Sequence, residues 1–326
     1  MLSRVANLTY WMARYLERAD NSARILDVNT QLALENRAGP SDDARLWQPI
    51  IFALGDETLF KQLYPETTEQ SVAEFVLFNT KNPNSILSCI NLARENARCI
   101  RDQLSSEAWE QLNRLYLHMR DKTVADYHGV GTTDFLSRLR KSIQLFYGIA
   151  ASMLPRNDGW HFYNLGRFLE RADNTSRVID VKYFTLLPSA LAVGSALDAL
   201  HWAAVLRSCS AFEAFRKSRL GVIKAERVLE YLILDEFFPR SIRFSIITAE
   251  EAVRRLTRDA DHHYSNAPSR SLGRLRADLD YLLIGDIVSH GLHEWIDNLQ
   301  LKIAKIHEDI ESAFVDYDIE RARILG

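Results

Sequence analysis

Apolar residues recur at helical spacing along nearly the whole chain, and no run shows the two-residue alternation of strands bounded by tight turns. Glycine and proline are few, 13 and 8 in 326 residues, and most fall between the periodic segments, where they end helices. The pattern predicts an all-α fold, with DYHGVGTT (126–133) as a loop. The predicted helices cover residues 3–37, 43–54, 57–64, 68–79, 84–103, 105–121, 132–153, 160–188, 195–217, 221–236, 240–260, 269–285 and 289–318.

One charged helical segment occurs twice. RYLERADNSARILDV at 14–28 returns as RFLERADNTSRVIDV at 167–181, with ten of fifteen positions identical and the other five conservatively exchanged. The repeat predicts two related halves within a single helical bundle-like domain that spans residues 1–326. We expect the two long helices to pack closely about a pseudo-two-fold axis, as an antiparallel or crossed pair.

Each copy carries a polar stripe on one face and an apolar stripe opposite. At about 100° per residue, the apolar positions Leu16, Ala19, Ala23 and Leu26 share one sector, and their small side chains favour close helix packing. The polar sector is matched in residue type between the copies, including Asn, which is a mediocre helix former. Its members are Arg14, Glu17, Arg18, Asn21 and Arg24 in the first copy and Arg167, Glu170, Arg171, Asn174 and Arg177 in the second.

The polar stripe has three interpretations. In the first, the stripe forms an interhelical lattice in which each Glu accepts hydrogen bonds from Arg side chains. In the second, it lines a cleft that presents Arg and Asn donors to an anionic or amide ligand. These two interpretations are compatible with each other. In the third, Glu17 and Glu170 form an acid/base pair, because facing carboxylates can split their pKa values. The neighbouring arginines disfavour this last interpretation, since they lower the pKa of both carboxyls.

Two further segments offer weaker binding candidates. LRSCSAFEAFRK (206–217) places Arg207 and Glu213 near Ser210, although capping of a helix is the commoner role for such a serine. FFPRSIRF (237–244) places Arg240 and Arg243 at a helix start, where an anion can bind, although Pro there commonly just begins a helix.

Composition narrows the function classes. A net charge of −3 argues against broad binding to nucleic acid or to a membrane surface, and no apolar run of about 18 residues is present to span a bilayer. Three cysteines without CxxC spacing and an N-terminus without signal-peptide features lead us to expect a cytoplasmic protein. The sequence shows no nucleotide-binding motif, and adjacent His262 and His263 point apart on a helix, so we expect neither a cofactor nor a metal.

These segments together resemble the bacterial alpha-E family, helical proteins with a Glu-Arg motif. The resemblance rests on YLERADNSARILDVN, SILSCINLARENARCIRDQLSSEAWEQLN (85–113), FLERADNTSRVIDV, LRSCSAFEAFRK and FPRSIRFSI, which span most of the chain. It implies an all-α, cytosolic protein that is typically encoded beside a circularly permuted ATP-grasp protein and a transglutaminase-like peptidase.

The resemblance implies a role in making or modifying a peptide or amide-linked product. We therefore predict an accessory protein that binds a ligand or partner, with an ATP-grasp protein as its partner and a peptide or carboxylate as its ligand. The alternative is an enzyme of amide or peptide chemistry whose active site is the duplicated Glu-Arg stripe.

Overall fold

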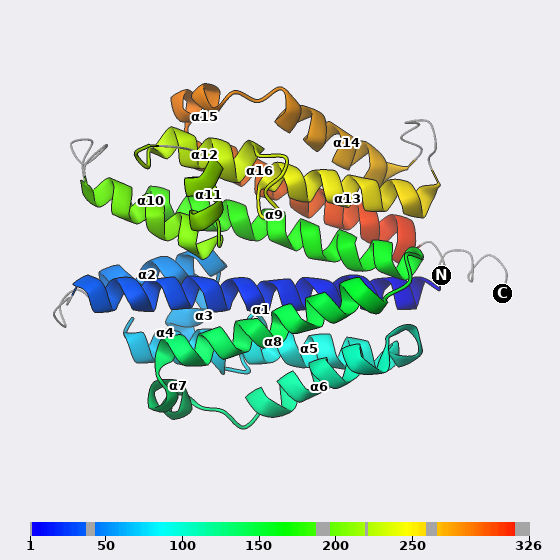
Figure 1. Ribbon diagram of the computed structural model, residues 1–326, viewed down its shortest axis with the longest axis horizontal. Helices are drawn as coiled ribbons and strands as arrows, with labels where there is room; N and C mark the ends of the chain where they lie inside the picture. The colour runs from blue at the N-terminus through cyan, green and yellow to red at the C-terminus, as the bar shows by residue number, and fades with distance from the viewer. Residues whose placement is uncertain (1, 37–42, 187–195, 219–220, 259–265, 317–326) are drawn as a thin grey trace.

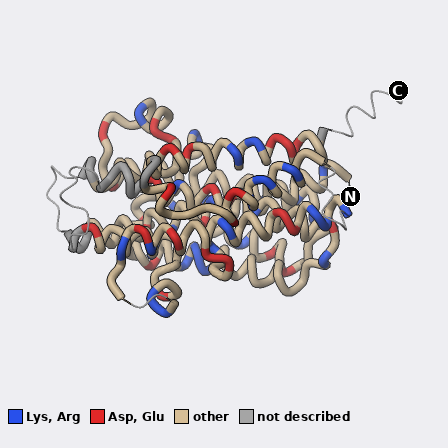
Figure 2. Tube along the Cα trace, turned by 90° about the horizontal axis from the view of Figure 1, so that it is seen from above, with Lys and Arg blue, Asp and Glu red and all other residues tan. Residues whose placement is uncertain are grey.

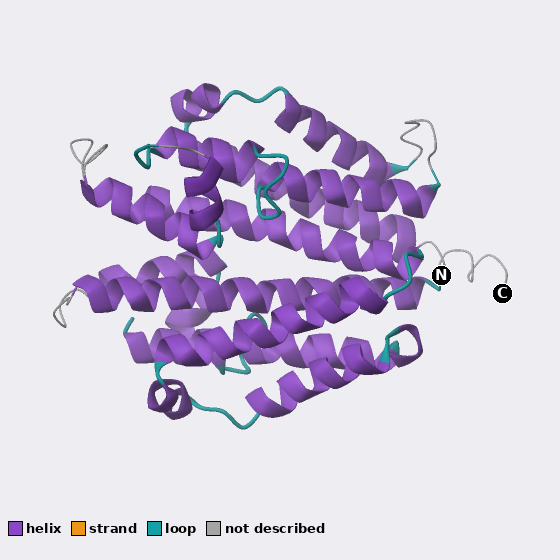
Figure 3. Ribbon diagram, in the orientation of Figure 1, coloured by secondary structure: helices purple, strands orange, loops and turns teal. Residues whose placement is uncertain are grey.

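The computed structural model describes residues 2–36, 43–186, 196–218, 221–258 and 266–316. The regular structure in these ranges is helical and includes no strand, which confirms the predicted all-α fold (Figure 3). The first half of the chain forms α1 (Ser3–Asn36), α2 (Asp43–Leu54), α3 (Glu57–Leu63), α4 (Glu69–Leu77), α5 (Ile86–Cys99), the short 3₁₀ helix η2 (Arg101–Gln103), α6 (Ser106–Met119), α7 (Val124–Val130) and α8 (Thr132–Met153). The second half forms α9 (Asp158–Leu186), α10 (Ala196–Ser208), α11 (Phe212–Ser218), α12 (Ala225–Leu234), α13 (Ile242–Thr257), α14 (Ala267–Asp280), α15 (Ile284–His290), α16 (Leu292–Glu311) and the π-helical turn η4 (Ser312–Asp316).

The sequence-based helix assignment fails at three short elements. α7 lies largely in the segment that we predicted as a loop, and α15 was merged in part with the helix before it. Each has only seven residues, too few to show helical periodicity. The helix predicted over 195–217 is broken between α10 and α11, where Ser210 has a φ of 50°.

The duplication extends well beyond the fifteen residues visible in the sequence. In the described residues each half holds eight α-helices, and their packing repeats: α1 packs on α5 and α8, and α9 packs on α13 and α16. Across the halves, α2 contacts α9 and α10 contacts α1. Figure 1 shows the two halves on opposite sides of the central pair of α1 and α9.

Equivalent helices begin with equivalent caps, which explains why the two halves fold alike locally. Ser85 accepts a hydrogen bond from the backbone N–H of Ser88 at the start of α5, and Ser241 accepts one from that of Phe244 at the start of α13. Both serines follow a proline by two residues, in NPNS (82–85) and FPRS (238–241). This alignment makes Asn84 and Arg240 equivalent positions of the two halves.

The two repeat helices pack against each other as predicted, but they run in the same direction. Tyr10 near the start of α1 lies against Gly166 near the start of α9, and one turn later Arg14 bonds to Glu170. Both helices run from right to left in Figure 1. The antiparallel arrangement expected from the sequence is therefore wrong, and the pseudo-two-fold axis runs along the helices.

The apolar stripe of α1 is part of a core shared by both halves. Leu16, Ala19, Ala23 and Leu26 are fully buried, as the periodicity predicted. Gly166 allows the close approach of α9, because a Cβ at this position would overlap the carbonyl oxygen of Tyr10.

We expect Gly166→Ala to destabilise the fold by about 1–3 kcal/mol, because α1 and α9 must separate to admit the methyl group. The matched control is Gly148→Ala in α8, where an added Cβ meets no atom within 4 Å. That change should be neutral or stabilise by up to about 1 kcal/mol, since Ala is the better helix former. Urea unfolding of both variants measures the difference, and equal stabilities would contradict the close contact.

Candidate functional site

The Glu17 carboxylate is the centre of the first half of the polar stripe. It is fully buried and accepts a two-pronged bond from Arg171, with Nε–Oε1 at 2.7 Å and Nη2–Oε2 at 2.8 Å. Arg240 adds a bond from Nη1 to Oε1 at 3.1 Å, and Arg167 adds one from Nε to Oε2 at 3.4 Å. Three arginines of the second half thus hold one carboxylate of the first.

Glu170 has the reciprocal arrangement. Arg18 donates to it through Nε at 2.7 Å and Nη2 at 3.1 Å, and Arg14 donates through Nε at 2.8 Å. Residue 14 meets residue 170 and residue 167 meets residue 17, the reciprocity of a two-fold interface. Asn84, the equivalent of Arg240, carries no charge, and its Oδ1 accepts a bond from Nη1 of Arg18.

The arginines keep both glutamates ionised. Burial alone would raise the pKa of Glu17, but the charges of Arg171 and Arg240 outweigh it and hold that pKa well below its usual range. At Glu170, burial is likewise outweighed by Arg18 and Arg14, and the pKa falls to about 2. Neither carboxyl holds a proton near neutral pH, so neither can act as a general acid there.

One turn further along, the two halves diverge. In the first, Arg24 binds Asp20 (Nε–Oδ2 2.9 Å), Asp20 also accepts from Nη2 of Arg240 at 2.7 Å, and Arg24 also contacts the Ser210 hydroxyl. The Arg24 side chain is 4% exposed. In the second, Arg177 binds Asp173 at 2.8 Å, but 33% of its side chain is exposed, and among the described residues the position equivalent to Arg240 is the uncharged Asn84.

At the next turn the second half opens into a pocket of about 260 Å³. In the first half Arg140 of α8 binds Asp27 at 2.6 Å. In the second, the equivalent carboxylate, Asp180, is bound by His293 of α16 at 2.8 Å. The pocket is lined by Phe52, Ala53, Gly55, Glu57, Thr58, Arg177, Asp180, His293, Asp297 and Gln300.

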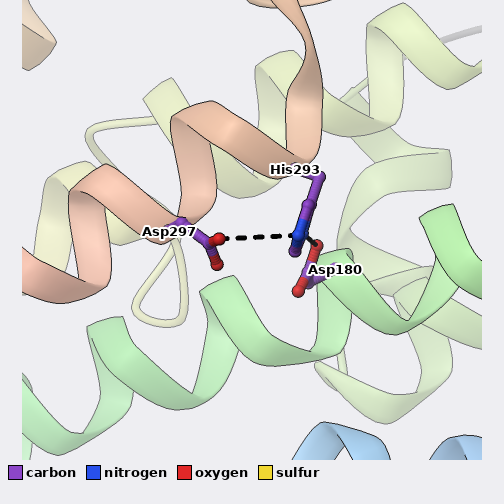
Figure 4. A group of neighbouring side chains, drawn as sticks. All are labelled: Asp180, His293 and Asp297. Atoms are coloured by element: carbon purple, nitrogen blue, oxygen red, sulfur yellow. Dashed lines mark hydrogen bonds and ion pairs between the residues drawn. The ribbon is translucent and has the colours of Figure 1, made fainter.

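Asp180, His293 and Asp297 form a tight polar group in this pocket. Asp180 comes from α9, whereas His293 and Asp297 lie one turn apart on α16 (Figure 4). One ligand atom from each residue lies within 4.8 Å of the others, so in the part of the chain that the structure describes these three side chains could hold a metal ion. Burial raises the pKa of Asp180, although the hydrogen bond from His293 opposes this shift. Burial alone would lower the pKa of His293, but the carboxylate of Asp180 outweighs burial, and the pKa of His293 is raised.

The structure gathers most of the candidate residues, but not all. The ten stripe residues lie along α1 and α9, and Arg240 joins them through Glu17 and Asp20. Asn21 and Asn174 are buried, and Nδ2 of Asn174 has no hydrogen-bond partner within the described part of the chain. Arg207, Glu213 and Arg243 were not found in this network. Arg207 is exposed and stacks on Phe212, and Glu213 is also exposed. Arg243 binds Asp280 instead.

The acidic partners and the histidine of the pocket were not among the residues predicted from the sequence. Asp20 and Asp173, like Asp27 and Asp180, are identical in the two copies, so the repeat itself carried a signal for them. The i, i+4 spacing of His293 and Asp297 was a weaker signal, because nothing in the sequence places them beside Asp180. The His262-His263 pair lies outside the described residues.

A cavity away from the polar stripe and a mixture of charges are found on the described part of the molecule. A cavity of about 490 Å³ lies between α14, α15 and α16 and includes no residue of the polar stripe. Figure 2 shows Lys and Arg interspersed with Asp and Glu along the described helices. None of the helices that the structure describes combines the length and apolar character needed to cross a bilayer.

The fold and this network define an all-helical protein built on a duplicated, buried Glu-Arg lattice. The chain belongs to the Alpha-E family, described as a predicted alpha-helical domain with a conserved ER motif, which matches residues 1–315. The Glu-Arg pairs of α1 and α9 fit that description.

Similar proteins include the uncharacterized protein Mb2597 of Mycobacterium bovis and the uncharacterized protein Rv2567 of Mycobacterium tuberculosis. Each is 24% identical over 330 residues, which cover 96% of this chain and 34% of the relative. The chain thus spans about a third of the length of these curated relatives. No solved structure matches it.

We expect Glu170→Gln to make the free energy of unfolding less dependent on pH in the acid range. Because the pKa of Glu170 is about 2 in the fold against 4.5 ordinarily, its contribution is complete above about pH 4.5 and is lost as the pH falls toward 2. Urea unfolding should show a deficit of about 3–5 kcal/mol for the variant at pH 7 that shrinks by about 2 kcal/mol at pH 3. A deficit that stays constant with pH would show that the charge does not matter.

Arg24→Met and Arg177→Met compare equivalent arginines of the two halves. Removal of Arg24 leaves Asp20 buried with one partner fewer, and we expect a loss of about 3–5 kcal/mol. Removal of the more exposed Arg177 should cost about 1 kcal/mol or less. Thermal unfolding of the two variants tests this ranking, and an equal or larger loss for Arg177→Met would contradict the divergence of the halves.

Proposed function

We propose that this protein is a ligand-binding, accessory component of a bacterial system that makes or modifies a peptide or amide-linked product, and that it acts with an ATP-grasp protein. The observation that carries the proposal is the division of the polar stripe. Its central charges satisfy one another inside the protein, and its end on α9 opens into a polar pocket. We infer that the stripe holds this pocket rigid for a ligand.

The pocket fits a small ligand that carries both charges. Arg177 offers donors to a carboxylate, and Glu57, Asp180 and Asp297 offer acceptors to an ammonium group or to amide N–H groups. A volume of about 260 Å³ lies just below the roughly 300–1,000 Å³ that is usual for small-molecule sites. One or two residues at the end of a peptide match this size and charge better than a nucleotide does.

The ATP-grasp partner is inferred from the family resemblance. In the Mycobacterium relatives the matched segment is 34% of the chain and is joined to further polypeptide, so in those proteins it is linked to other parts of the same chain. In amide-bond formation this chain would then bind the end of the peptide, and the separate ATP-using partner would activate the carboxylate.

The alternative function, an amide- or peptide-processing enzyme with Glu17 or Glu170 as acid/base, has less physical support. Both carboxylates are buried, held by two or three arginines, and have lowered pKa values. Neither lines the pocket. General acid–base catalysis needs a pKa near the working pH and a reachable substrate proton.

We expect the purified chain to co-elute with an ATP-grasp protein of the same organism, the kind of partner that the family resemblance implies, and to raise peptide-dependent ADP formation by that protein. Arg177→Met should lower this stimulation by roughly tenfold, because a charge-assisted bond to the ligand is lost. The complex itself should persist, and Arg120→Met, which removes an exposed arginine, serves as the control.

Two results would overturn the proposal. One is hydrolysis or synthesis of an amide by the isolated chain, since this would make the protein the catalyst. The other is full stimulation by Arg177→Met, since this would place the ligand elsewhere.

A further inference from the structure

The two halves also differ in chemistry at the turn that follows Arg24 and Arg177. α8 and α16 each begin directly after a glycine with positive φ, Gly131 at 94° and Gly291 at 110°. Counted from these glycines, His293 occupies the position of Thr133, and Gln300 that of Arg140. The half with the arginine has its carboxylate in an ion pair, and the half without it has a histidine beside an open pocket.

The imidazole of His293 lies between two carboxylates. Its Nδ1 is 2.8 Å from Oδ1 of Asp180, which is the length of a good hydrogen bond. Its Nε2 is 3.4 Å from Oδ2 of Asp297, which is long for a hydrogen bond between charged groups. Figure 4 shows Asp180 and Asp297 reaching the ring from α9 and α16.

The longer distance suits two ligands of one metal ion. Zinc lies about 2.0–2.1 Å from a histidine nitrogen and about 2.0–2.2 Å from a carboxylate oxygen. A tetrahedral ion with these bonds separates its ligand atoms by roughly 3.3 Å. The bond from Nδ1 to Asp180 is the arrangement by which proteins orient a metal-binding histidine and make its other nitrogen a better ligand.

We propose that this pocket binds a divalent transition-metal ion of the zinc type through Nε2 of His293 and the carboxylate of Asp297. Asp180 is the positioning residue that accepts the Nδ1–H. The pocket side of the ion is open to water or to the bound ligand. Such an ion would polarise an amide or carboxylate oxygen of a ligand in the pocket.

This inference rests on the proposed function only in sharing its pocket. It is tested with the metal alone, without ligand or partner, so that the two proposals can fail separately. Calorimetric titration of the full chain, freed of metal with a chelator, should show one Zn²⁺ bound per chain. Co²⁺ should bind at the same place and give a visible absorption band that Zn²⁺ removes.

Three variants test the assigned roles. His293→Ala and Asp297→Asn should each weaken Zn²⁺ binding at least a hundredfold and abolish the Co²⁺ band. Asp180→Asn keeps an acceptor for the Nδ1–H but loses its charge, and it should weaken binding by roughly tenfold, within the 10–100-fold usual for such partners. Circular dichroism verifies that each variant is folded.

Two controls separate this site from other histidines. His128→Ala alters an exposed histidine that lies 3.9 Å from Glu69, and the double change His262→Ala/His263→Ala removes the adjacent pair in the sequence. Both should bind Zn²⁺ like the wild type. Absence of Zn²⁺ binding by the wild type, or unchanged binding by His293→Ala, would overturn the proposal.

Discussion

The fold depends on two buried carboxylates that are neutralised by arginines of the opposite repeat helix. An isolated ionised glutamate in the core would cost many kcal/mol, so Glu17 and Glu170 can be buried only where α1 and α9 meet in one register. A slip of one turn would carry each carboxylate away from its paired guanidinium groups. The lattice therefore fixes the register of the central helices, and the helices that pack on them inherit their positions.

Duplication allows one copy of this arrangement to be completed and the other to stay open. On α1, Asp20 is surrounded by Arg24 and by Arg240 of the second half, and Arg140 binds Asp27. At the equivalent site on α9, the first half supplies Asn84 where the second half has Arg240, and Arg177 stays partly exposed beside the pocket. The symmetric centre gives a rigid frame, and the chemistry of a site can lie in the few positions where the halves differ.

The sequence revealed the all-α fold and the contact of the repeat helices, because a charged face on a long buried helix needs a complementary face. It could not reveal whether the two repeat helices run parallel or antiparallel. Arginines lie on both sides of Glu17, at positions 14 and 18, so an antiparallel partner would satisfy the same ion pairs. A contact away from the centre, that of Tyr10 with Gly166, requires the parallel arrangement. The pocket was beyond reach for a similar reason, since Asp180 and His293 are 113 residues apart and meet only through the packing of α16 on α9.

The same electrostatics that stabilise the lattice separate it from the chemistry of the pocket. Around Glu17 and Glu170, arginine charges outweigh burial and both carboxyls stay ionised; at Asp180 burial outweighs its single histidine partner, and the pKa moves upward. The stripe thus passes from fully compensated charge at its centre to incompletely compensated charge at its α9 end. A ligand or ion gains most binding free energy where the charge of the protein is incompletely compensated. Its own charge there takes the place of a missing partner and displaces no existing one. The arginine-poor end of the second half is therefore the place where binding costs the fold least.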